Sequence, residues 1–229
     1  MEIRIESLLD GASRALGAVA IIDVLRAFTT AAVAFANGAS TITMVGTVEE
    51  ALTLRDSGKG HLCMGETRGR KPAGFDFGNS PFEVSGANFT GQSIIQRTSA
   101  GTQGMIAATH AERRYAASLV TASATAHALR ASPAERITLV PMGGSGVERT
   151  DEDELCAMHL RNLLEGRSGD AASIRRLVLA GGEAPRYHDS ARPHLHPHDL
   201  DIALDIDRYD FAIRVDMTDG RPVARIERP

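Results

Sequence analysis

The stretch AVAIIDVLRAFTTAAVAFANG, residues 18–38, decides the fold class. It begins with a continuous apolar run that ends at Asp23, a pattern typical of a buried strand whose carboxyl end opens on a site. Residues 24–36 are mostly small and apolar and are followed by Asn37-Gly38, so we expect a helix there. A buried strand followed by a helix is the repeating unit of a layered α/β protein with a largely parallel or mixed sheet.

The same alternation continues along the chain. We expect further strands at residues 2–8, 42–45, 61–64, 93–97 and 136–142, a short β-prone segment at 119–123, and helices at 48–57, 102–111, 123–131 and 151–165. In the tail we expect two helices and a hairpin, near 171–178, at 199–207 and around Asp219-Gly220. The whole chain, 1–229, is expected to form one compact domain. The alternative that residues 166–229 form a semi-separate C-terminal extension stays open.

Composition limits the function. Of the 229 residues, 43% are hydrophobic, and the net charge of −4 gives no electrostatic footprint for nucleic acid or a membrane surface. The N-terminal sequence MEIRIESLL lacks a basic region followed by an apolar run, so we expect no signal peptide and a cytoplasmic protein. No apolar run approaches the ~18 residues of a membrane span. Cys63 and Cys156 form no motif and are expected to be free, buried thiols.

The segment GETRGRKPAGFDFGNSP, residues 65–81, is an irregular loop that is dense in charge. Its four glycines and two prolines exclude a regular helix or strand. Its end reads as a capping box, with Ser80 at the N-cap, Pro81 next and Glu83 at the third helical position. Capping does not explain the other charged residues, and two interpretations stay open for them: a solvated loop or a binding site.

Three further segments place polar groups near expected strand ends. Asp23 and Arg26 follow the first buried strand, either as part of a ligand site or as a helix N-cap and a surface arginine. Residues 97–102, RTSAGT, lead through small hydroxylic residues into a helix, whose backbone N–H groups would favour an anion. A glycine loop at 143–146 precedes four consecutive acids at 151–154, which repel one another unless a cation is nearby.

Other phosphate and metal chemistries fit less well. Cysteine phosphatases need a longer spacing between Cys and Arg than the four residues that separate Cys63 from Arg68. An aspartyl-phosphate mechanism of the haloacid-dehalogenase type needs a second acid two places after Asp23, where Leu25 stands. The run HLHPH, residues 194–198, offers transition-metal ligands and is kept as a third alternative, although its proline breaks the helical spacing.

Taken in order, these segments resemble the 2-phosphosulfolactate phosphatase family of the coenzyme M pathway. The matching text is IDVLRAFTTAAVAFANGA (22–39), the GETRG and GFDFGNSP parts of 65–81, TSAGTQGM (98–105), SLVTASATA (118–126) and DEDELCA (151–157). The resemblance spans about residues 1–165 and is looser in the tail. It implies a three-layer α/β/α fold and the Mg²⁺-dependent hydrolysis of a small hydroxy-acid phosphomonoester, 2-phospho-3-sulfolactate, to 3-sulfolactate and phosphate.

The resemblance also implies roles for individual residues. Asp23, Glu66 and Asp76 would be catalytic. The Mg²⁺ ligands would come from among the same three residues, Glu152 and Asp153, and one of these carboxylates would orient or deprotonate the attacking water. The substrate would be bound by residues of the cationic and anion-cradle segments: Arg26, Arg68, Arg70, Asn79, Arg97, Ser99, Gly101 and Thr102. A multiply anionic substrate needs focused cations of this kind in a net-acidic protein. The expected partner is a small phosphorylated molecule, with a homodimer as an open alternative to a monomer.

The chain departs from the family pattern at four places. Thr67, Ala100, Thr121 and Met158 stand where the pattern has Arg, Asn, Asn and Gly. An amide side chain can hydrogen-bond a substrate or a water molecule, and alanine cannot. These departures keep a second hypothesis open, in which the chain is a non-catalytic anion-binding protein on the same fold.

Overall fold

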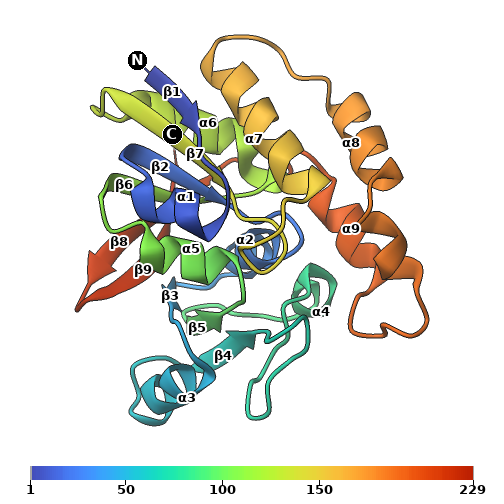
Figure 1. Cartoon of the computed structure of the whole chain (residues 1–229). Coiled ribbons are helices and arrows are strands. Elements are labelled where there is room, and N and C mark those ends of the chain that lie inside the picture. The colour runs from blue at the N-terminus through green and yellow to red at the C-terminus, as the bar shows by residue number, and fades with distance from the viewer. Residues whose placement is uncertain (1, 229) are drawn as a thin grey trace.

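The computed structural model describes residues 2–228, which form one sheet of nine strands with helices around it (Figure 1). The strands lie in the order β1-β7-β2-β6-β8-β9-β3-β5-β4, so β1 is at an edge, as its alternating sequence predicts. Their bounds are β1 Glu2–Ile5, β2 Gly17–Ile22, β3 Thr41–Met44, β4 Leu62–Gly65, β5 Ser93–Arg97, β6 Ala111–Ala117, β7 Arg136–Pro141, β8 Ala212–Thr218 and β9 Arg221–Glu227.

Two parallel groups of strands make up the sheet, and an antiparallel hairpin joins them. Strands β1, β7, β2 and β6 pair in parallel, and so do β3, β5 and β4. The hairpin of β8 and β9 pairs with β6 on one side and with β3 on the other. Its turn residues Asp219 and Gly220 both have positive φ (49° and 76°), which matches the twist of a two-residue hairpin. The predicted hairpin and the mixed, largely parallel sheet are confirmed.

Helices cover both faces of the sheet, which confirms the three-layer architecture. Strand β2 shows why, because its side chains alternate between two apolar cores. Val19 and Ile21 pack in one core with α1, α2 and α5, and Ala20 and Ile22 pack in the other with α6 and α7. The helices are α1 Leu8–Arg14, α2 Ala27–Ala36, α3 Val48–Asp56, α4 Pro81–Ser85, α5 Gly101–Ala107, α6 Ala122–Ala131, α7 Asp151–Leu164, α8 Ala171–Ala180 and α9 Pro197–Ala203, with the 3-10 helices η1 Leu119–Thr121 and η2 Ala184–His188.

Side-chain caps fix where the helices next to the charged loop begin. Thr47 caps α3 by accepting a hydrogen bond from the N–H group of Glu50 (3.1 Å), and Ser80 caps α4 in the same way through Glu83 (3.1 Å). The Glu83 carboxylate does not complete a capping box with Ser80, because it accepts from the N–H group of Gly78 instead (2.9 Å). The charged loop is therefore fastened to the first turn of α4.

The region 111–123 differs from expectation. Residues 111–117 form β6, which the sequence pattern does not predict because the strand begins with the polar run AERR. The β-prone segment 119–123 is not a strand, since it forms η1 and the start of α6. The carbonyl groups of Leu119 and Val120 accept hydrogen bonds from tail residues Asp207 and Tyr209 (both 3.0 Å), so this apolar segment is buried under the tail instead of in the sheet.

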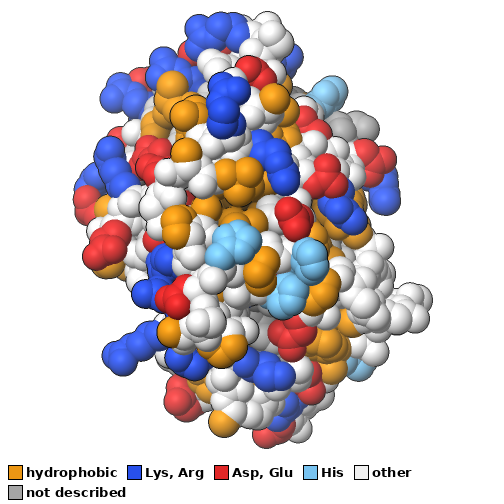
Figure 2. Space-filling view, turned by 90° about the vertical axis from the view of Figure 1, so that its right-hand side faces the viewer, with side chains coloured by type: hydrophobic (Ala, Val, Ile, Leu, Met, Phe, Trp, Pro, Cys, Tyr) orange, Lys and Arg blue, Asp and Glu red, His pale blue; other side chains and the backbone are white. Residues whose placement is uncertain are grey.

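The tail, residues 166–228, contributes both to the sheet and to the surface beside it. Strands β8 and β9 lie inside the nine-stranded sheet. Figure 2 shows the side of the molecule that carries α8 and α9, where His side chains gather among apolar and acidic ones. His196 and His198 lie against the ring of Phe82 in α4, with ring centroids 4.1 and 5.1 Å from it. None of the helices described in residues 2–228 combines the length and hydropathy that a membrane span requires.

Candidate active site

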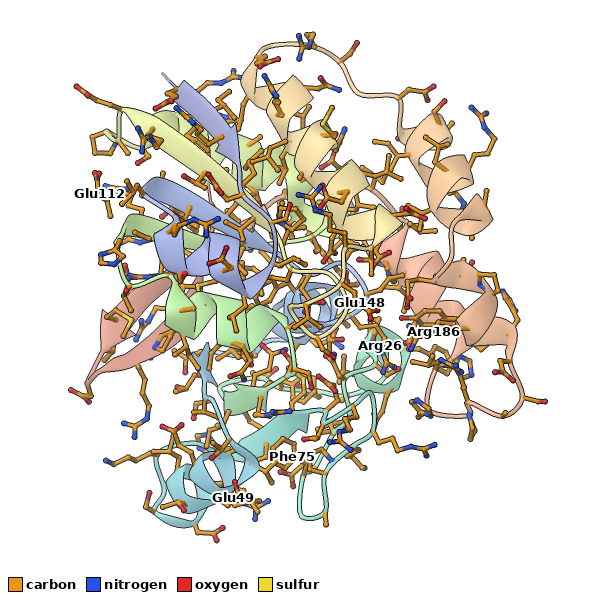
Figure 3. The ribbon with its side chains drawn as sticks, in the orientation of Figure 1. Arg26, Glu49, Phe75, Glu112, Glu148 and Arg186 are labelled. Carbon is orange, nitrogen blue, oxygen red and sulfur yellow. The ribbon has the colours of Figure 1, made fainter. Side chains whose placement is uncertain are left out.

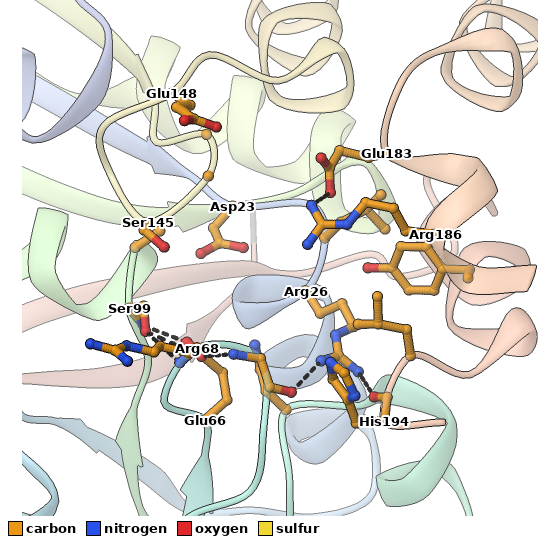
Figure 4. A pocket seen from close by; sticks show the side chains of 18 of the residues that line it. Asp23, Arg26, Glu66, Arg68, Ser99, Ser145, Glu148, Glu183, Arg186 and His194 are labelled. Carbon is orange, nitrogen blue, oxygen red and sulfur yellow. Dashed lines mark hydrogen bonds and ion pairs between the residues drawn. The ribbon is translucent and has the colours of Figure 1, made fainter. Parts of the chain in front are cut away.

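One cavity of about 370 Å³ collects residues from several strand ends and from the tail (Figure 4). Asp23 follows β2, Glu66 follows β4, Ser99 follows β5 and Gly143 follows β7. The hairpin reverses the strand direction between the two parallel groups, yet the cavity collects residues that follow the carboxyl ends of strands from both groups. Ligands of α/β proteins commonly bind at the carboxyl ends of strands. We therefore take this cavity as the candidate active site.

Asp23 lies at the centre of the cavity. Its carboxylate is buried and accepts hydrogen bonds from the backbone N–H groups of Ala27 (2.9 Å) and Gly101 (2.8 Å). Burial is the main cause that raises the pKa of Asp23 to about 6, and the negative charge of Glu66 acts in the same direction. The cavity thus holds two buried acidic side chains whose negative charges repel each other, an arrangement that a cation would stabilise.

The predicted anion cradle at residues 97–102 is used mostly by the protein itself. The Gly101 N–H group already binds Asp23, and a Cβ atom at this position would lie 2.9 Å from the Asp23 carboxylate, so the close approach requires glycine. Thr102 is buried, and its hydroxyl group donates to the carbonyl group of Thr98 (2.9 Å). Gly101 and Thr102 therefore support the cavity wall without lining it, whereas Ser99 lines the cavity.

Glu66 holds the charged loop around the cavity. Its carboxylate accepts hydrogen bonds from the N–H group of Gly69 (2.6 Å) and from the N–H and hydroxyl groups of Ser99. Arg97 lies outside the cavity and donates to the Glu66 carbonyl group (2.8 Å) and to the Thr67 hydroxyl group (3.0 Å). The guanidinium group of Arg97 therefore fastens the loop to β5.

Arg26 is a buried cation on the cavity wall. Its side chain is 4% exposed and forms an ion pair with the fully buried Asp199 at 2.9 Å. The same guanidinium group donates to the carbonyl groups of His194 (2.9 Å) and Gly69 (3.3 Å). Arg26 thus connects the charged loop, the tail and the cavity, and most of its donors have partners within the protein.

Arg68 and Arg186 are the other arginines among the described residues of the cavity wall. Within residues 2–228, the Arg68 guanidinium group makes neither a hydrogen bond nor an ion pair, so it is free to bind an anion. Arg186 pairs with Glu183, a residue of the tail. Asn79 also lines the cavity, and its carbonyl oxygen has no partner in the described part of the chain.

Asp153 and Glu152, in the first turn of α7, lie behind the cavity wall. Asp153 accepts hydrogen bonds from the N–H groups of Val24 (2.7 Å) and Gly143 (2.8 Å), so it ties the end of β2 to the glycine loop after β7. Burial, then the charges of Glu152 and Asp23, raise the pKa of Asp153 well above its ordinary value. Burial also raises the pKa of Glu152 to about 7. These two acids support the site without lining the cavity.

Asp76 and Arg70 of the charged loop lie outside the cavity. Asp76 accepts a hydrogen bond from the N–H group of Cys63 (2.8 Å) and lies 3.5 Å from Arg55, so it fastens the loop to β4. Arg70 is exposed, and its backbone pairs with that of Thr67. The structure therefore does not bring Asp76 together with the other two predicted catalytic residues.

Sequence reasoning missed the part of the wall that comes from the tail. Five tail residues line the cavity: Glu183, Arg186, Tyr187, His194 and Leu195. Figure 3 shows Arg186 beside Arg26 in space, although the two come from opposite ends of the chain. The signal that could have found this wall is the irregular Pro/His-rich composition of residues 185–198, since ordered irregular loops often carry function. The glycine loop also reaches the cavity, through Gly143, Gly144, Ser145, Val147 and Glu148.

A metal site made of protein ligands alone is not present in the described residues. Within 2–228, no three His, Cys, Asp or Glu side chains lie together as a metal ion would require. This finding removes the support for a transition-metal site in the His-rich run. A Mg²⁺ site needs fewer protein ligands, because Mg²⁺ keeps several waters and takes one or two carboxylates with phosphate oxygens. Asp23 and Glu66 fit that requirement.

Comparison with known proteins assigns the family. A family model described as 2-phosphosulpholactate phosphatase matches residues 5–211. The chain belongs to the 2-phosphosulfolactate phosphatase family. Relatives named probable 2-phosphosulfolactate phosphatase include proteins of Bacillus subtilis (32% identical, over 91% of this chain and 90% of the relative), Deinococcus radiodurans (34%, over 81% and 78%) and Thermotoga petrophila (38%, over 66% and 65%).

The departures of this 2-phosphosulfolactate phosphatase family member from the family pattern lie at different distances from the cavity. Ala100 lines it, whereas Thr67 points its hydroxyl group at Arg97. Thr121 is fully buried, and Met158 is half exposed beside a groove between α7 and α8. Ala100 is therefore the departure that changes the polar lining of the site.

Proposed function

We propose that this protein is a phosphoric monoester hydrolase whose substrate is a small, multiply anionic hydroxy-acid phosphate, 2-phospho-3-sulfolactate in the first instance. The observation that carries the proposal is the pair of buried carboxylates, Asp23 and Glu66, on a cavity that arginines also line. The names of the relatives support the substrate. In the reaction, water attacks phosphorus, the bond to the ester oxygen breaks, and the leaving alcohol takes up a proton.

The charges of the cavity support Mg²⁺ as the cofactor. Its described lining holds four acids and three arginines, so with neutral histidine it has no net positive charge; the acids are Asp23, Glu66, Glu148 and Glu183. A substrate with phosphate, sulfonate and carboxylate groups would be repelled by such a site unless a cation joined it. Asp23 and Glu66 would hold Mg²⁺, which supplies positive charge to the phosphate oxygens.

The residues of the chain would do the rest of the chemistry by positioning. The free guanidinium group of Arg68 suits two parallel hydrogen bonds to a phosphate group. One of the two carboxylates, Asp23 or Glu66, would orient the attacking water and accept its proton. Phosphate-monoester hydrolysis is among the slowest uncatalysed reactions, and its catalysis rests on charge neutralisation and alignment of the attacking oxygen.

Phosphate release from 2-phosphosulfolactate and related esters tests this proposal. We expect turnover with Mg²⁺, loss of turnover with EDTA, and recovery when Mg²⁺ is added back. Asp23→Asn and Glu66→Gln should lower kcat/KM by about 10²-fold or more, as removal of a charge-positioning group does. Asp76→Asn is the matched control, since this carboxylate lies outside the cavity. A folded protein that turns over none of these esters with Mg²⁺ would favour the non-catalytic anion-binding alternative.

A further inference from the structure

The tail wall of the cavity is the surface made by Glu183, Arg186, Tyr187, His194 and Leu195. In Figure 4, Arg186 and His194 lie on one side of the cavity, Glu66 and Ser99 lie on the other, and Asp23 lies between them. The two sides therefore present different groups to one bound molecule. One side has Glu66, Ser99 and the unpaired Arg68, and the other has the Arg186–Glu183 pair with aromatic groups.

Arg186 is the cation of the tail wall, and most of its donors are unused. Its side chain is 44% exposed, and one of its five N–H groups is paired with Glu183. Arg26 differs, because it donates to Asp199 and to two backbone carbonyl groups. A guanidinium group with free donors in a fork matches the geometry of a carboxylate or another oxyanion. Arg186 therefore has free donors with which to bind an anion, whereas most donors of Arg26 already have partners within the protein.

Tyr187 places a neutral donor next to Arg186. Its ring is 4% exposed and packs in an apolar cluster with Ala184, Leu195 and Leu200, which fixes the wall in position. Burial raises the pKa of the Tyr187 hydroxyl group well above its usual value, so the group stays protonated. No hydrogen bond within residues 2–228 engages this hydroxyl group, which leaves it available to an anion in the cavity.

We propose that Arg186, with Tyr187 beside it, binds a second oxyanion of the substrate, the sulfonate or carboxylate group that lies beyond the phosphate ester. The proposal rests on the proposed phosphatase function and divides the cavity into two parts. The phosphate group binds on the side of Asp23, Glu66 and Arg68, and the second oxyanion binds the tail wall. Arg186 is then a specificity-determining residue, which selects phosphorylated acids over simple phosphate esters.

The test compares esters that differ in the number of oxyanions. The wild-type enzyme and Arg186→Gln are assayed with 2-phosphosulfolactate, with 2-phospholactate and with isopropyl phosphate, which carries no second oxyanion. We expect Arg186→Gln to lower kcat/KM by about 10- to 100-fold for an ester with a second oxyanion, the factor that corresponds to one lost hydrogen bond to a charge. The value for isopropyl phosphate should stay within about twofold, because that ester has nothing for Arg186 to bind. A loss for both acids would show that Arg186 binds the carboxylate group. A loss for 2-phosphosulfolactate alone would show that it binds the sulfonate group.

Arg192→Gln is the matched control. Arg192 lies in the same tail segment and forms an i,i+3 ion pair with Asp189, as Arg186 does with Glu183, but it does not line the cavity. It should leave all three kcat/KM values unchanged. An equal loss for all three esters in Arg186→Gln, or no loss for any of them, would overturn the proposal.

Failure of the proposed function itself would show as an inactive wild-type protein. In that case the binding of 3-sulfolactate, followed by the rise in Tm that it causes, still tests the tail wall. A rise in the wild-type protein and in Arg192→Gln that is lost in Arg186→Gln would support the assignment of Arg186. An equal rise in all three proteins, or no rise in the wild-type protein, would refute it.

Discussion

At the scale of single residues, the raised pKa of Asp23 would link the proposed binding of Mg²⁺ to pH. A carboxylate binds a metal ion in its ionised form, and burial raises the pKa of Asp23 to about 6. Below that pH a proton occupies the carboxylate and Mg²⁺ must displace it. We therefore expect the Mg²⁺ concentration for half-maximal activity to rise as the pH falls through 6, by about tenfold per further pH unit.

Mg²⁺ titrations of activity at pH 7.5, 6 and 5 measure this dependence. Asp76→Asn, which alters a carboxylate outside the cavity, should follow the wild-type curve. A half-saturating Mg²⁺ concentration that stays constant across this range would show that Asp23 does not hold the metal ion.

The sequence could predict which segments reach the site, but not which of their side chains face the cavity. Asp23, Glu66 and Ser99 each follow a strand, and a strand end places its next residues at the mouth of a layered sheet. Asp76 and Arg97 carry equally suitable groups, but their side chains turn away from the cavity to fasten the loop. The direction of a side chain depends on the fold around it, which composition and spacing do not contain.

At the scale of elements, the Asp199 carboxylate fastens α9 to α4 and to the cavity. It is fully buried and accepts hydrogen bonds from the Ser80 hydroxyl group (2.6 Å), the Phe82 N–H group (3.0 Å) and Arg26 (2.9 Å). Asp199→Ala would leave Arg26 as a buried, unpaired charge. This should lower the free energy of unfolding by about 3–5 kcal/mol. In a protein of this size, we expect Tm to fall by about 6–20 °C.

Asp201→Ala is the matched control, because Asp201 lies in the same helix, is 60% exposed and pairs at the surface with Arg175 and His198. Surface pairs contribute little, so its Tm should change by less than about 3 °C. Thermal unfolding followed by circular dichroism distinguishes the two variants. Equal changes in Tm would contradict the role assigned to the buried pair.

Among the elements, the strands and helices with clear periodicity were predictable, and those that depend on distant partners were not. Strand β2 is apolar throughout because both of its faces are buried, and this gives it a strong signal. Strand β6 begins with exposed and half-buried polar residues, and its pairing with β8 joins it to a part of the chain about a hundred residues away. Local sequence contains no sign of such a partner.

At the scale of the whole molecule, the hairpin of β8 and β9 makes one sheet from two groups of strands. Removal of residues 210–229 would expose the edges of β6 and β3. It would also uncover the apolar residues against which Ile213 and Val215 pack. We expect the truncated protein to lose its cooperative thermal transition and its near-UV circular dichroism. Asp219→Asn keeps a favourable hairpin turn and should unfold as the wild-type protein does. A truncated protein with a sharp, native-like transition would show that each group of strands folds alone.

The central place of the hairpin also determines when the sheet can be completed during protein synthesis. The ribosome releases a chain from its N-terminus at about 5–20 residues per second, and domains generally fold as units. Strands β6 and β3 emerge early, but β8 and β9, which join them, emerge after all the other strands described. Until then the nascent chain carries two open strand edges, and the two groups of strands are not yet joined in one sheet. The growing chain therefore passes through a period in which its sheet is incomplete and a chaperone can bind its exposed strand edges.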